Sequence, residues 1–396
     1  MMQISPEIQL FIREHSSDDV RVLALQAKKY PDIDMPTVIT QIAGRKVAAE
    51  KIPSWWEIEK IWYPKHLSLE QCSSEITARY KARLLQGDSL TDLTGGFGID
   101  CSFLATGFKS ATYVERQEEL CEIAAHNFPV LNLNHINIKN EDGVTYLQVM
   151  SPVDCLFLDP ARRNEHGGKT VAISDCEPNV AELEELLLQK ANRVMIKLSP
   201  MLDLSLALKE LKQTQEVHIL SVNNECKELL ILLGQTSPTE ISIHCVNLST
   251  KGTQEEQHFV FTREQEQCSE CTYTDSLETY LYEPNASLLK AGAFRSIAAA
   301  YPVRKLHPNS HLYTSDTFIE NFPGRIFRIV NQCSFNKKEV KENLADLKKA
   351  NVTVRNFPAT VAELRKRIHL AEGGDTYLFA STLNNGQKVL IRCEKV

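Results

Sequence analysis

The sequence predicts an α/β fold in which helices cover both faces of a mostly parallel sheet, preceded by a helical region and followed by an α+β domain. Strand and helix patterns alternate from about residue 69 onward. The strand patterns, such as 153–158, are apolar runs, which is typical of parallel strands buried on both faces. A second alternation of strands and helices ends the chain.

The chain is long enough to contain more than one domain. Its 396 residues exceed what a single hydrophobic core ordinarily serves. With 43% hydrophobic and 24% charged residues, the composition is that of a soluble globular protein. We expect a helical region at 1–68, an α/β domain at 69–265, a small α+β region at 277–323 and an α+β domain at 324–396, with a polar, loop-rich segment at 251–276.

The helical region is expected to contain at least two helices. Ser16-x-x-Asp19 resembles a capping box at the start of one helix. A second helical run follows the tripeptide at 34–36, Asp-Met-Pro. The adjacent Trp55 and Trp56 are expected to pack in the interior, since aromatic side chains dominate buried contact area, and stacking on a nucleobase is the alternative.

The α/β domain is expected to close with an antiparallel pair of strands. Two apolar runs, 217–222 and 229–233, are joined by a polar turn at 223–224. A closing pair of this kind is not expected of a plain dinucleotide-binding sheet. The other expected elements are helices at 69–86, 100–106, 117–127, 179–191 and 203–213 and strands at 89–93, 111–115, 136–138, 153–158, 193–198, 241–243 and 259–261.

The last domain is expected to have the element order βαβαββ. Thr360-x-x-Glu363 is a capping box for its second helix. Asn385-Gly386 is typical of a two-residue hairpin turn. The expected elements are strands at 325–330, 352–356, 376–380 and 388–392 and helices at 337–349 and 361–369.

Composition also indicates where the protein works. No window approaches the roughly 18 apolar residues of a membrane span, and the first residues lack the pattern of a signal peptide. Eleven cysteines lie scattered in apolar runs, which suits buried thiols in a reducing compartment. Cys268-x-x-Cys271 has no second pair at zinc-ribbon spacing, so no metal site is expected. We expect a cytoplasmic protein without membrane contact.

Charge is distributed unevenly along the chain. The net charge of −7 argues against indiscriminate binding to nucleic acid. Residues 324–396 nevertheless hold 14 Lys and Arg against 7 Asp and Glu, which leaves −14 for the remainder. A basic domain on an acidic body can steer a polyanion to one face, and solvated basic helices are the equally weighted alternative.

A glycine loop at 90–100, Leu-Thr-Asp-Leu-Thr-Gly-Gly-Phe-Gly-Ile-Asp, stands between a predicted strand and a predicted helix. Glycine permits a tight turn and the close approach of a ligand. A dinucleotide-binding loop reads G-x-G-x-x-G and cradles a pyrophosphate, whereas the spacing here is G-G-x-G. Asp92 at the strand end suits a cationic amino-acid ligand better than a diphosphate, which disfavours an NAD-dependent oxidoreductase.

Acidic residues follow the next three strands in order. Glu115 ends the second strand, Asp142-Gly143 follows the third, and Asp159-Pro160 follows the fourth. Ligands of open α/β sheets bind at the C-terminal ends of the strands. There Glu115 can accept hydrogen bonds from ribose hydroxyls and Asp142 from an adenine amino group. Taken singly, each is equally well explained as a solvated acid at a strand end.

Residues 69–235 resemble the class I S-adenosylmethionine (SAM) dependent methyltransferases. The likeness rests on the D-x-T-G-G-x-G loop, the strand-end acids and a motif similar to D-P-P-x at 159–162, where Ala161 replaces the second proline. The whole chain resembles a bacterial methyltransferase family with a THUMP-like C-terminal domain, through 70–75, 282–287 and 355–358. The resemblance implies a Rossmann-like class I methyltransferase sheet and a ferredoxin-like or THUMP-like α+β domain.

The resemblance also implies SAM as the cofactor and assigns residues to its parts. Asp159 would lie beside both cofactor and substrate. Glu115 would hold the ribose, and Asp142 and Gly143 the adenine. The residues implied for the methionine part are Asp92, Thr94, Gly95, Gly96 and Gly98.

Asp159, Pro160 and Arg162 are the expected catalytic positions. In amine-methylating relatives, the Asp side chain or the following backbone carbonyl accepts a hydrogen bond from the target N–H. Arg162 stands where those enzymes place an aromatic residue that stacks on a flipped base, and its guanidinium can stack or grip a phosphate. A plain Asp-Pro turn is the alternative. Carbon-5 methylation of pyrimidines is disfavoured, because the motif has no cysteine nucleophile.

True THUMP domains bind RNA, so the resemblance implies methyl transfer to structured RNA, tRNA or rRNA, at a base nitrogen. The alternatives are a methyltransferase acting on a protein or small molecule, and an RNA-binding protein with a degenerate SAM site. The sequence leaves the oligomeric state open. The candidate substrate contacts are Arg162, Arg163, Lys169, Arg355, Arg365, Lys366 and Arg367, with Lys348, Lys349, Arg325 and Arg328 as further basic candidates.

Overall fold

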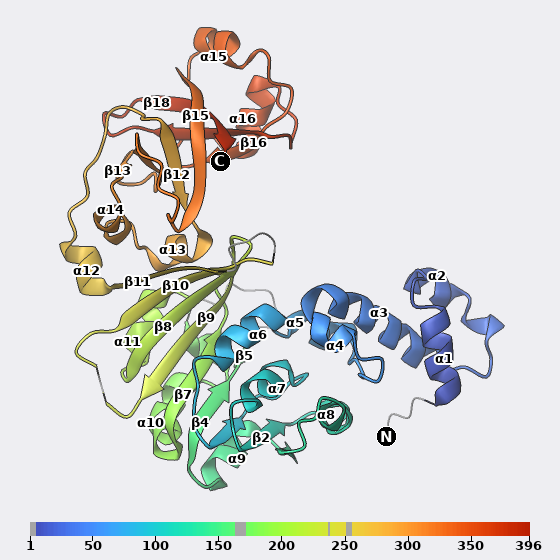
Figure 1. The fold of residues 1–396 in the computed structure, drawn as a ribbon. Helices are drawn as coiled ribbons and strands as arrows, with labels where there is room; N and C mark the ends of the chain where they lie inside the picture. The colour runs from blue at the N-terminus through green and yellow to red at the C-terminus, as the bar shows by residue number, and fades with distance from the viewer. Residues whose placement is uncertain (1–4, 163–171, 237, 251–255) are drawn as a thin grey trace. The chain divides into compact units, whose positions relative to one another are not determined.

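The computed structural model describes residues 5–162, 172–236, 238–250 and 256–396. The chain forms two compact units, shown in Figure 1. Unit 1 comprises Met1–Gln215 and Leu229–Thr239, and unit 2 comprises Glu216–Glu228 and Glu240–Val396. Within the described part of the chain, no helix is both long enough and apolar enough to cross a membrane.

Unit 1 begins with several helices, and aspartates cap the starts of α2 (Val20–Leu25) and α3 (Met35–Lys51). Asp19 caps α2, because its carboxylate accepts a hydrogen bond from Arg21 N at 2.7 Å. The predicted capping box is wrong, since Ser16 instead donates to the carbonyl of Arg13 at 2.9 Å. The other helices of this region are α1 (Pro6–Glu14), the 3₁₀ helix η1 (Ala27–Lys29) and α4 (Pro53–Trp56).

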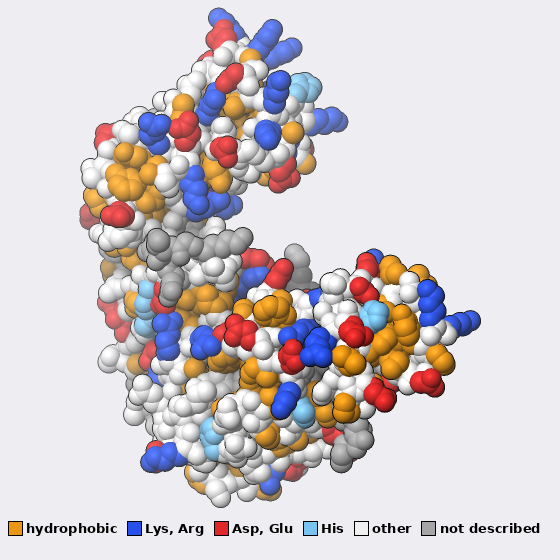
Figure 2. Space-filling view, turned by 45° about the vertical axis from the view of Figure 1, so that its right-hand side comes forward, with side chains coloured by type: hydrophobic (Ala, Val, Ile, Leu, Met, Phe, Trp, Pro, Cys, Tyr) orange, Lys and Arg blue, Asp and Glu red, His pale blue; other side chains and the backbone are white. Residues whose placement is uncertain are grey.

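The first helices share a small core and leave part of their surface apolar. Leu23, from α2, packs there with residues of α3. Leu10, Val22 and Leu25 are exposed. Figure 2 shows apolar side chains among charged ones at the end of the helical region that carries α1 and α2.

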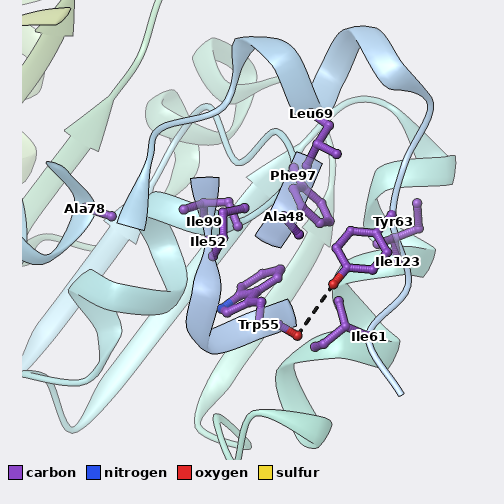
Figure 3. Close-up of a cluster of buried hydrophobic side chains, with 10 residues drawn as sticks. All are labelled: Ala48, Ile52, Trp55, Ile61, Tyr63, Leu69, Ala78, Phe97, Ile99 and Ile123. Atoms are coloured by element: carbon purple, nitrogen blue, oxygen red, sulfur yellow. Dashed lines mark hydrogen bonds between the residues drawn. The ribbon is translucent and has the colours of Figure 1, made fainter. Parts of the chain in front are cut away.

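Trp55 joins the helical region to the glycine loop. Its side chain is 2% exposed, and its ring meets Phe97 of the loop edge-on at 5.2 Å between centroids. The Tyr63 hydroxyl donates to the Trp55 carbonyl at 3.5 Å (Figure 3). Interior packing is thus confirmed for Trp55, and stacking on a base is excluded by burial. Trp56 differs, since it is 42% exposed and lies under the Arg45 guanidinium.

The helix predicted at 69–86 is in fact two helices, α5 (His66–Gln71) and α6 (Glu75–Ala82). Cys72 adopts an extended conformation and ends the first helix. Ser73 follows and turns its hydroxyl into the interior, where it donates to Asp100 at 2.7 Å. Serine hydroxyls compete with helical backbone bonding, and this buried contact explains the break.

The sheet of unit 1 confirms the predicted α/β fold. Its strand order is β9-β7-β4-β1-β2-β3. All neighbouring pairs are parallel except β9, which runs antiparallel to β7. The strands are β1 (Ser89–Asp92), β2 (Ser110–Glu115), β3 (Ile136–Asn140), β4 (Val153–Leu158), β7 (Ala191–Leu198) and β9 (Glu225–Gly234).

The direction in which strands are added reverses between β1 and β4. Because crossover connections are right-handed, this reversal places helices on both faces of the sheet (Figure 1). In open α/β sheets the ligand crevice lies beyond the C-terminal ends of the strands at such a reversal, which here are β1 and β4. One face carries α7 (Ile99–Ala105) and α8 (Glu118–Val130), the other α9 (Gly143–Val149) and α10 (Val180–Lys190), and α11 (Leu204–Glu210) follows β7.

Unit 2 begins with three strands. β8 (Thr214–Val222) pairs parallel with β10 (Ser242–Leu248), which pairs antiparallel with β11 (Glu256–Thr262). Asn223 and Asn224, which follow β8, both have positive φ, 50° and 67°, as a type I′ turn requires.

The prediction that segment 251–276 is rich in loops is wrong for its described residues. The strand β11 is followed directly by the helix α12 (Arg263–Cys268). Thr262 and Gln265 cap this helix reciprocally, at 3.1 and 3.0 Å, and so stabilise its first turn.

The rest of unit 2 surrounds a seven-stranded sheet with the order β13-β14-β12-β15-β18-β17-β16. The predicted βαβαββ order is confirmed. Gly386 adopts a φ of 85° in the hairpin turn between the last two strands. The elements are β12 (Tyr280–Pro284), α13 (Ala286–Ala291), α14 (Ser296–Ala300), β13 (Arg304–Lys305), β14 (Tyr313–Ser315), β15 (Gly324–Ser334), α15 (Lys337–Leu344), β16 (Asn351–Val354), α16 (Val361–Ile368), β17 (Thr376–Thr382) and β18 (Lys388–Lys395).

Candidate active site in the crevice of unit 1

The glycine loop lies tightly against the second strand of the sheet. Gly95 N donates to the carbonyl of Val114 at 2.9 Å, and a Cβ at Gly95 would lie 2.3 Å from the ring of Tyr113. The Tyr113 hydroxyl donates to the Gly96 carbonyl at 2.5 Å. Gly96 and Gly98 have φ of 54° and 87°, a conformation that favours glycine. These glycines are therefore required by the turn itself.

Asp92 presents a buried carboxylate oxygen without a partner. The residue is 1% exposed, and its Oδ1 accepts a hydrogen bond from Thr94 N at 2.9 Å. Its Oδ2 is buried and makes no hydrogen bond with any residue that the structure describes. Burial, aided by the nearby acids Asp100, Asp159 and Glu115, raises the pKa of Asp92 to about 8. A buried acceptor left unpaired is costly, so this oxygen suits a ligand that brings a donor.

Glu115 ties the glycine loop to the end of the second strand. One carboxylate oxygen accepts from Gly96 N at 2.9 Å, and the other accepts from Gln117 N at 2.8 Å. The residue is 8% exposed. Each carboxylate oxygen has a second lone pair, so Glu115 can still accept a hydrogen bond from a hydroxyl group of a ligand.

Asp142 and Gly143 form the turn after the third strand. Asp142 is exposed and caps α9, with Oδ1 accepting from Val144 N at 3.1 Å and Thr145 N at 3.0 Å. A Cβ at Gly143 would lie 2.1 Å from the carbonyl oxygen of Leu93. Glycine at this position therefore lets the turn approach the end of β1, and so brings Asp142 to the same edge of the sheet.

Asp159 lies at the end of β4, next to the end of β1. Its N–H donates to the Thr94 hydroxyl at 2.6 Å, which links the D-P motif to the glycine loop. Its carboxylate lies 2.5 Å from Lys197 Nζ, on the neighbouring strand β7. Burial raises the pKa of the Asp159 carboxyl above its ordinary value, and Lys197 opposes that rise.

A buried charge network underlies Asp159, and sequence reasoning missed it. Lys81, whose side chain is fully buried, lies 2.9 Å from Asp100 Oδ1, and Lys197 lies 3.5 Å from Asp100 Oδ2. Ser73 accepts hydrogen bonds from both lysines, at 2.8 and 3.1 Å. Burial acts to raise the pKa of Asp100, but the two lysines outweigh it and lower that pKa to about 2. The available signal was Lys197, a charged residue within an apolar strand.

The residues after Asp159 are only partly described. Pro160 is buried, and Ala161 and Arg162 form the short strand β5 (Ala161–Arg162). β5 pairs antiparallel with β6 (Cys176–Glu177), where Arg162 lies opposite Cys176. The predicted substrate contacts Arg163 and Lys169 lie outside the described residues.

The structure separates the basic residues of unit 2 into paired and exposed ones. Glu283, 2% exposed at its side chain, binds both Arg325, through Nε at 2.9 Å, and Arg355, at 3.1 Å. Arg328 pairs with Glu394 at 2.8 Å. These arginines therefore form ion pairs with acidic residues of unit 2.

Four of the candidate basic residues are exposed and have no ion pair among the described contacts. Lys366 and Arg367, in the last turn of α16, and Lys348 and Lys349 are exposed. Arg365 is largely buried, with 17% of its side chain exposed, 3.9 Å from Glu372. Figure 2 shows Lys and Arg side chains projecting from the part of unit 2 that carries α15.

Comparisons with known proteins add three kinds of finding. Family models described as a ferredoxin-like domain and as THUMP domain-like match residues 280–323 and 324–395. The crystal structure of a "putative methyltransferase" from Porphyromonas gingivalis W83 is 35% identical, with a TM-score of 0.87 and 98% of each chain covered. No curated protein matches.

Two smaller solved proteins also match part of the chain. An rRNA methylase from Streptococcus thermophilus is 15% identical, with a TM-score of 0.29, over 40% of this chain and 93% of that chain. A "putative methyltransferase" from Streptococcus mutans in complex with SAH is 14% identical, with a TM-score of 0.30, over 40% of this chain and 96% of that chain. Scores this low have no bearing on function.

The parallel sheet with its antiparallel strand β9, the G-G-x-G loop and the acids at the strand ends define a protein of the class I SAM-dependent methyltransferase fold. Residues 324–395 form a THUMP-like domain. Given the identity shared with the P. gingivalis protein over nearly all of both chains, this protein belongs to the same family of class I methyltransferases with a THUMP-like C-terminal domain.

Proposed function

We propose that this protein transfers a methyl group from SAM to structured RNA, tRNA or rRNA, with a base nitrogen as the acceptor. The observation that carries the proposal is the unpartnered, buried Oδ2 of Asp92 beside the glycine loop. An ammonium group is the partner that such an oxygen lacks, and the methionine part of SAM carries one. A diphosphate would bring no donor to this oxygen.

The residues around Asp92 fit the remaining parts of SAM. The glycine loop leaves backbone exposed to a ligand, because a Cβ at Gly96 would meet nothing closer than 3.7 Å. Glu115 keeps lone pairs for the ribose hydroxyls. Asp142 uses Oδ1 for its helix cap and offers Oδ2 to the adenine amino group. SAM would supply a methyl group made electrophilic by its sulfonium.

Asp159 would position the acceptor. Its carboxylate is held by Lys197 and its N–H by Thr94, so its orientation is fixed before the substrate arrives. The carboxylate or the Pro160 carbonyl would accept a hydrogen bond from the target N–H, aligning the nitrogen for in-line attack. Alignment of this kind supplies much of the rate of an SN2 transfer. We assign Arg162 to contact with the base or a neighbouring phosphate.

The RNA part of the proposal is supported by unit 2. The THUMP-like match covers the domain that carries the positive charge excess, 14 Lys and Arg against 7 Asp and Glu in 324–396. Exposed lysines and arginines such as Lys366 and Arg367 can contact phosphates. Arg355 and Arg365 would contribute less, because both face acidic partners.

The test is transfer of a tritiated methyl group from SAM to total bacterial RNA, with bacterial protein as a parallel substrate. We expect label in RNA that ribonuclease releases and protease does not. Gly96→Arg should abolish the transfer, because a bulky side chain would fill the cofactor cradle. Asp88→Asn is the matched control, since Asp88 is 70% exposed and pairs only with Lys109 among the described contacts of its side chain.

If the label is found only in protein, the substrate is a protein and the RNA part of the proposal is wrong. Salt-dependent RNA binding without any transfer would leave an RNA-binding protein with a degenerate SAM site, and the enzymatic part of the proposal would fail.

A further inference from the structure

Three histidines and a glutamate gather on three neighbouring strands of unit 2. Glu216 and His218 come from β8, His244 from β10 and His258 from β11. One ligand atom from each of Glu216, His218 and His244 lies within 4.8 Å of the others. His258 Nε2 lies 3.1 Å from His244 Nδ1 and extends the group to four residues.

Strand register explains why these side chains share one face. In the parallel pair β8–β10, His218 is opposite His244 and Glu216 is opposite Ser242. In the antiparallel pair β10–β11, His258 is opposite Val246 and therefore diagonal to His244. Side chains two residues apart point to the same face of a sheet, so the four residues converge. The cluster is thus a product of the fold, and it is invisible in the sequence.

The three imidazole rings of the cluster lie against one another. Their centroids are 4.3 Å apart for His218 and His244 and 5.3 Å apart for His244 and His258. Imidazole nitrogen is the commonest ligand of metal ions in proteins.

The solvent exposure of the four side chains increases from the buried His218 to the exposed His258. His218 is 2% exposed, the Glu216 side chain is 31% exposed, and His258 is exposed to solvent. A metal ion can therefore enter from the side of His258 and reach deeper ligands. Imidazoles with one carboxylate are a donor set of zinc and related first-row ions.

We propose that Glu216, His218, His244 and His258 bind a divalent first-row transition metal ion, of which Zn²⁺ is the best fit. Zinc–nitrogen bonds of about 2.0–2.1 Å put neighbouring ligand atoms roughly 3.3 Å apart in a tetrahedral site. The nitrogen pair of His244 and His258, at 3.1 Å, is already at this spacing. The ligand atoms of Glu216, His218 and His244 lie up to 4.8 Å apart, and rotation of the side chains, that of His258 included, would bring them to this spacing.

The bound ion would cross-link three strands of unit 2. It has no part in the proposed methyl transfer, whose cofactor-binding and acceptor-positioning residues belong to unit 1. Its expected effects are on the stability of unit 2 and not on SAM binding. Cys268 and Cys271 are a competing pair of ligands in the same unit, and the test must separate them from the histidines.

The test uses the full chain, stripped with chelator, and titrates ZnCl₂ by calorimetry and CoCl₂ by absorption spectroscopy. We expect one high-affinity ion per chain, and a cobalt spectrum without the near-ultraviolet band of thiolate ligation. Zinc should raise the melting temperature of the wild type. Glu216→Gln and His258→Gln, at partly exposed and exposed positions, should each lower zinc affinity at least tenfold, and His244→Gln should abolish binding.

Two controls decide the outcome. His369→Asn removes an exposed histidine whose φ of 55° asparagine tolerates, and it should leave affinity unchanged. The double variant Cys268→Ser and Cys271→Ser should also bind as the wild type does. Absence of zinc binding by the wild type would overturn the proposal. So would binding that survives Glu216→Gln and His258→Gln but is lost in the cysteine variant.

Discussion

Lys197 Nζ lies 2.5 Å from the carboxylate of Asp159, so the end of β7 holds the end of β4 at the crevice of unit 1. Lys197 is itself fixed by Asp100 and Ser73. A lysine 9% exposed at its side chain is costly to bury unless it is paired. The arrangement therefore orients Asp159, and the charge of Lys197 opposes the rise in the Asp159 pKa that burial causes.

The first prediction concerns this pair. Lys197→Met should slow single-turnover methyl transfer about 100-fold, as a misplaced positioning group does, and leave SAM affinity within a few-fold of wild type. Lys197→Arg should recover part of the rate because it keeps the charge. Melting temperature is the control for folding. A variant that binds SAM poorly but transfers at the normal rate would show that Lys197 supports the cofactor and not the acceptor.

The second prediction is a pH dependence of SAM binding. Because the pKa of Asp92 is raised to about 8, the unliganded protein holds a proton there at neutral pH. The cationic amino group of SAM pairs with the ionised form, so binding should release this proton. Affinity should rise by at most about tenfold per unit between pH 6 and 8 and then level off. Asp92→Asn should flatten the profile, and an unchanged slope would contradict the assignment.

The same residue should make stability depend on pH without cofactor. Asp92 has a folded-state pKa of about 8 against an ordinary 3.8, so ionisation opposes folding. Stability is greatest below the ordinary pKa and falls as pH rises towards the folded-state value. Asp92→Asn should therefore stabilise the protein more at pH 8 than at pH 5, by on the order of a few kcal/mol. Thermal unfolding at both pH values measures the difference.

The third prediction concerns Gly143. A Cβ at this residue would lie 2.1 Å from the backbone oxygen of Leu93, which cannot move as a side chain can. Gly143→Ala should lower the free energy of unfolding by about 1–3 kcal/mol and weaken SAM binding. Gly107→Ala is the matched control, because its Cβ would meet the Leu104 carbonyl at an ordinary 3.7 Å. Equal effects in urea unfolding would refute the steric explanation.

The fourth prediction concerns RNA binding by unit 2. Replacing Lys366 and Arg367 by alanine should weaken RNA binding in a manner independent of sequence. The slope of log affinity against log salt should decrease by about 1 for each phosphate that the variant no longer neutralises. Lys65→Ala, which removes a lysine 76% exposed in unit 1, should leave the slope unchanged. Weaker binding at constant slope would indicate that the two residues contact a group other than phosphate.

Local features of the fold were predictable from the sequence, because short patterns determine them. The glycine loop, the parallel strands and the βαβαββ order of 324–395 follow from apolar runs and turn residues. The split between α5 and α6 was missed because its cause, the contact of Ser73 with Asp100, joins residues distant in the sequence.

Contacts between distant residues also explain which features of the site the sequence could not reveal. Lys197 and Asp100 stand on different elements, and only the folded sheet brings them together. From the sequence alone, Arg355 is expected to be a solvated surface cation, whereas in the structure it forms an ion pair with Glu283. A local sequence pattern therefore cannot predict ion pairs between residues that are far apart in the chain.

The most direct test of the account is calorimetric titration of the full chain with SAM, in two buffers of different ionisation enthalpy. We predict one site of micromolar affinity, with release of a proton at pH 7 that disappears in Asp92→Asn. Gly96→Arg should show no binding. A wild-type protein that does not bind SAM, or that binds it equally well after both substitutions, would contradict the assignment of the crevice.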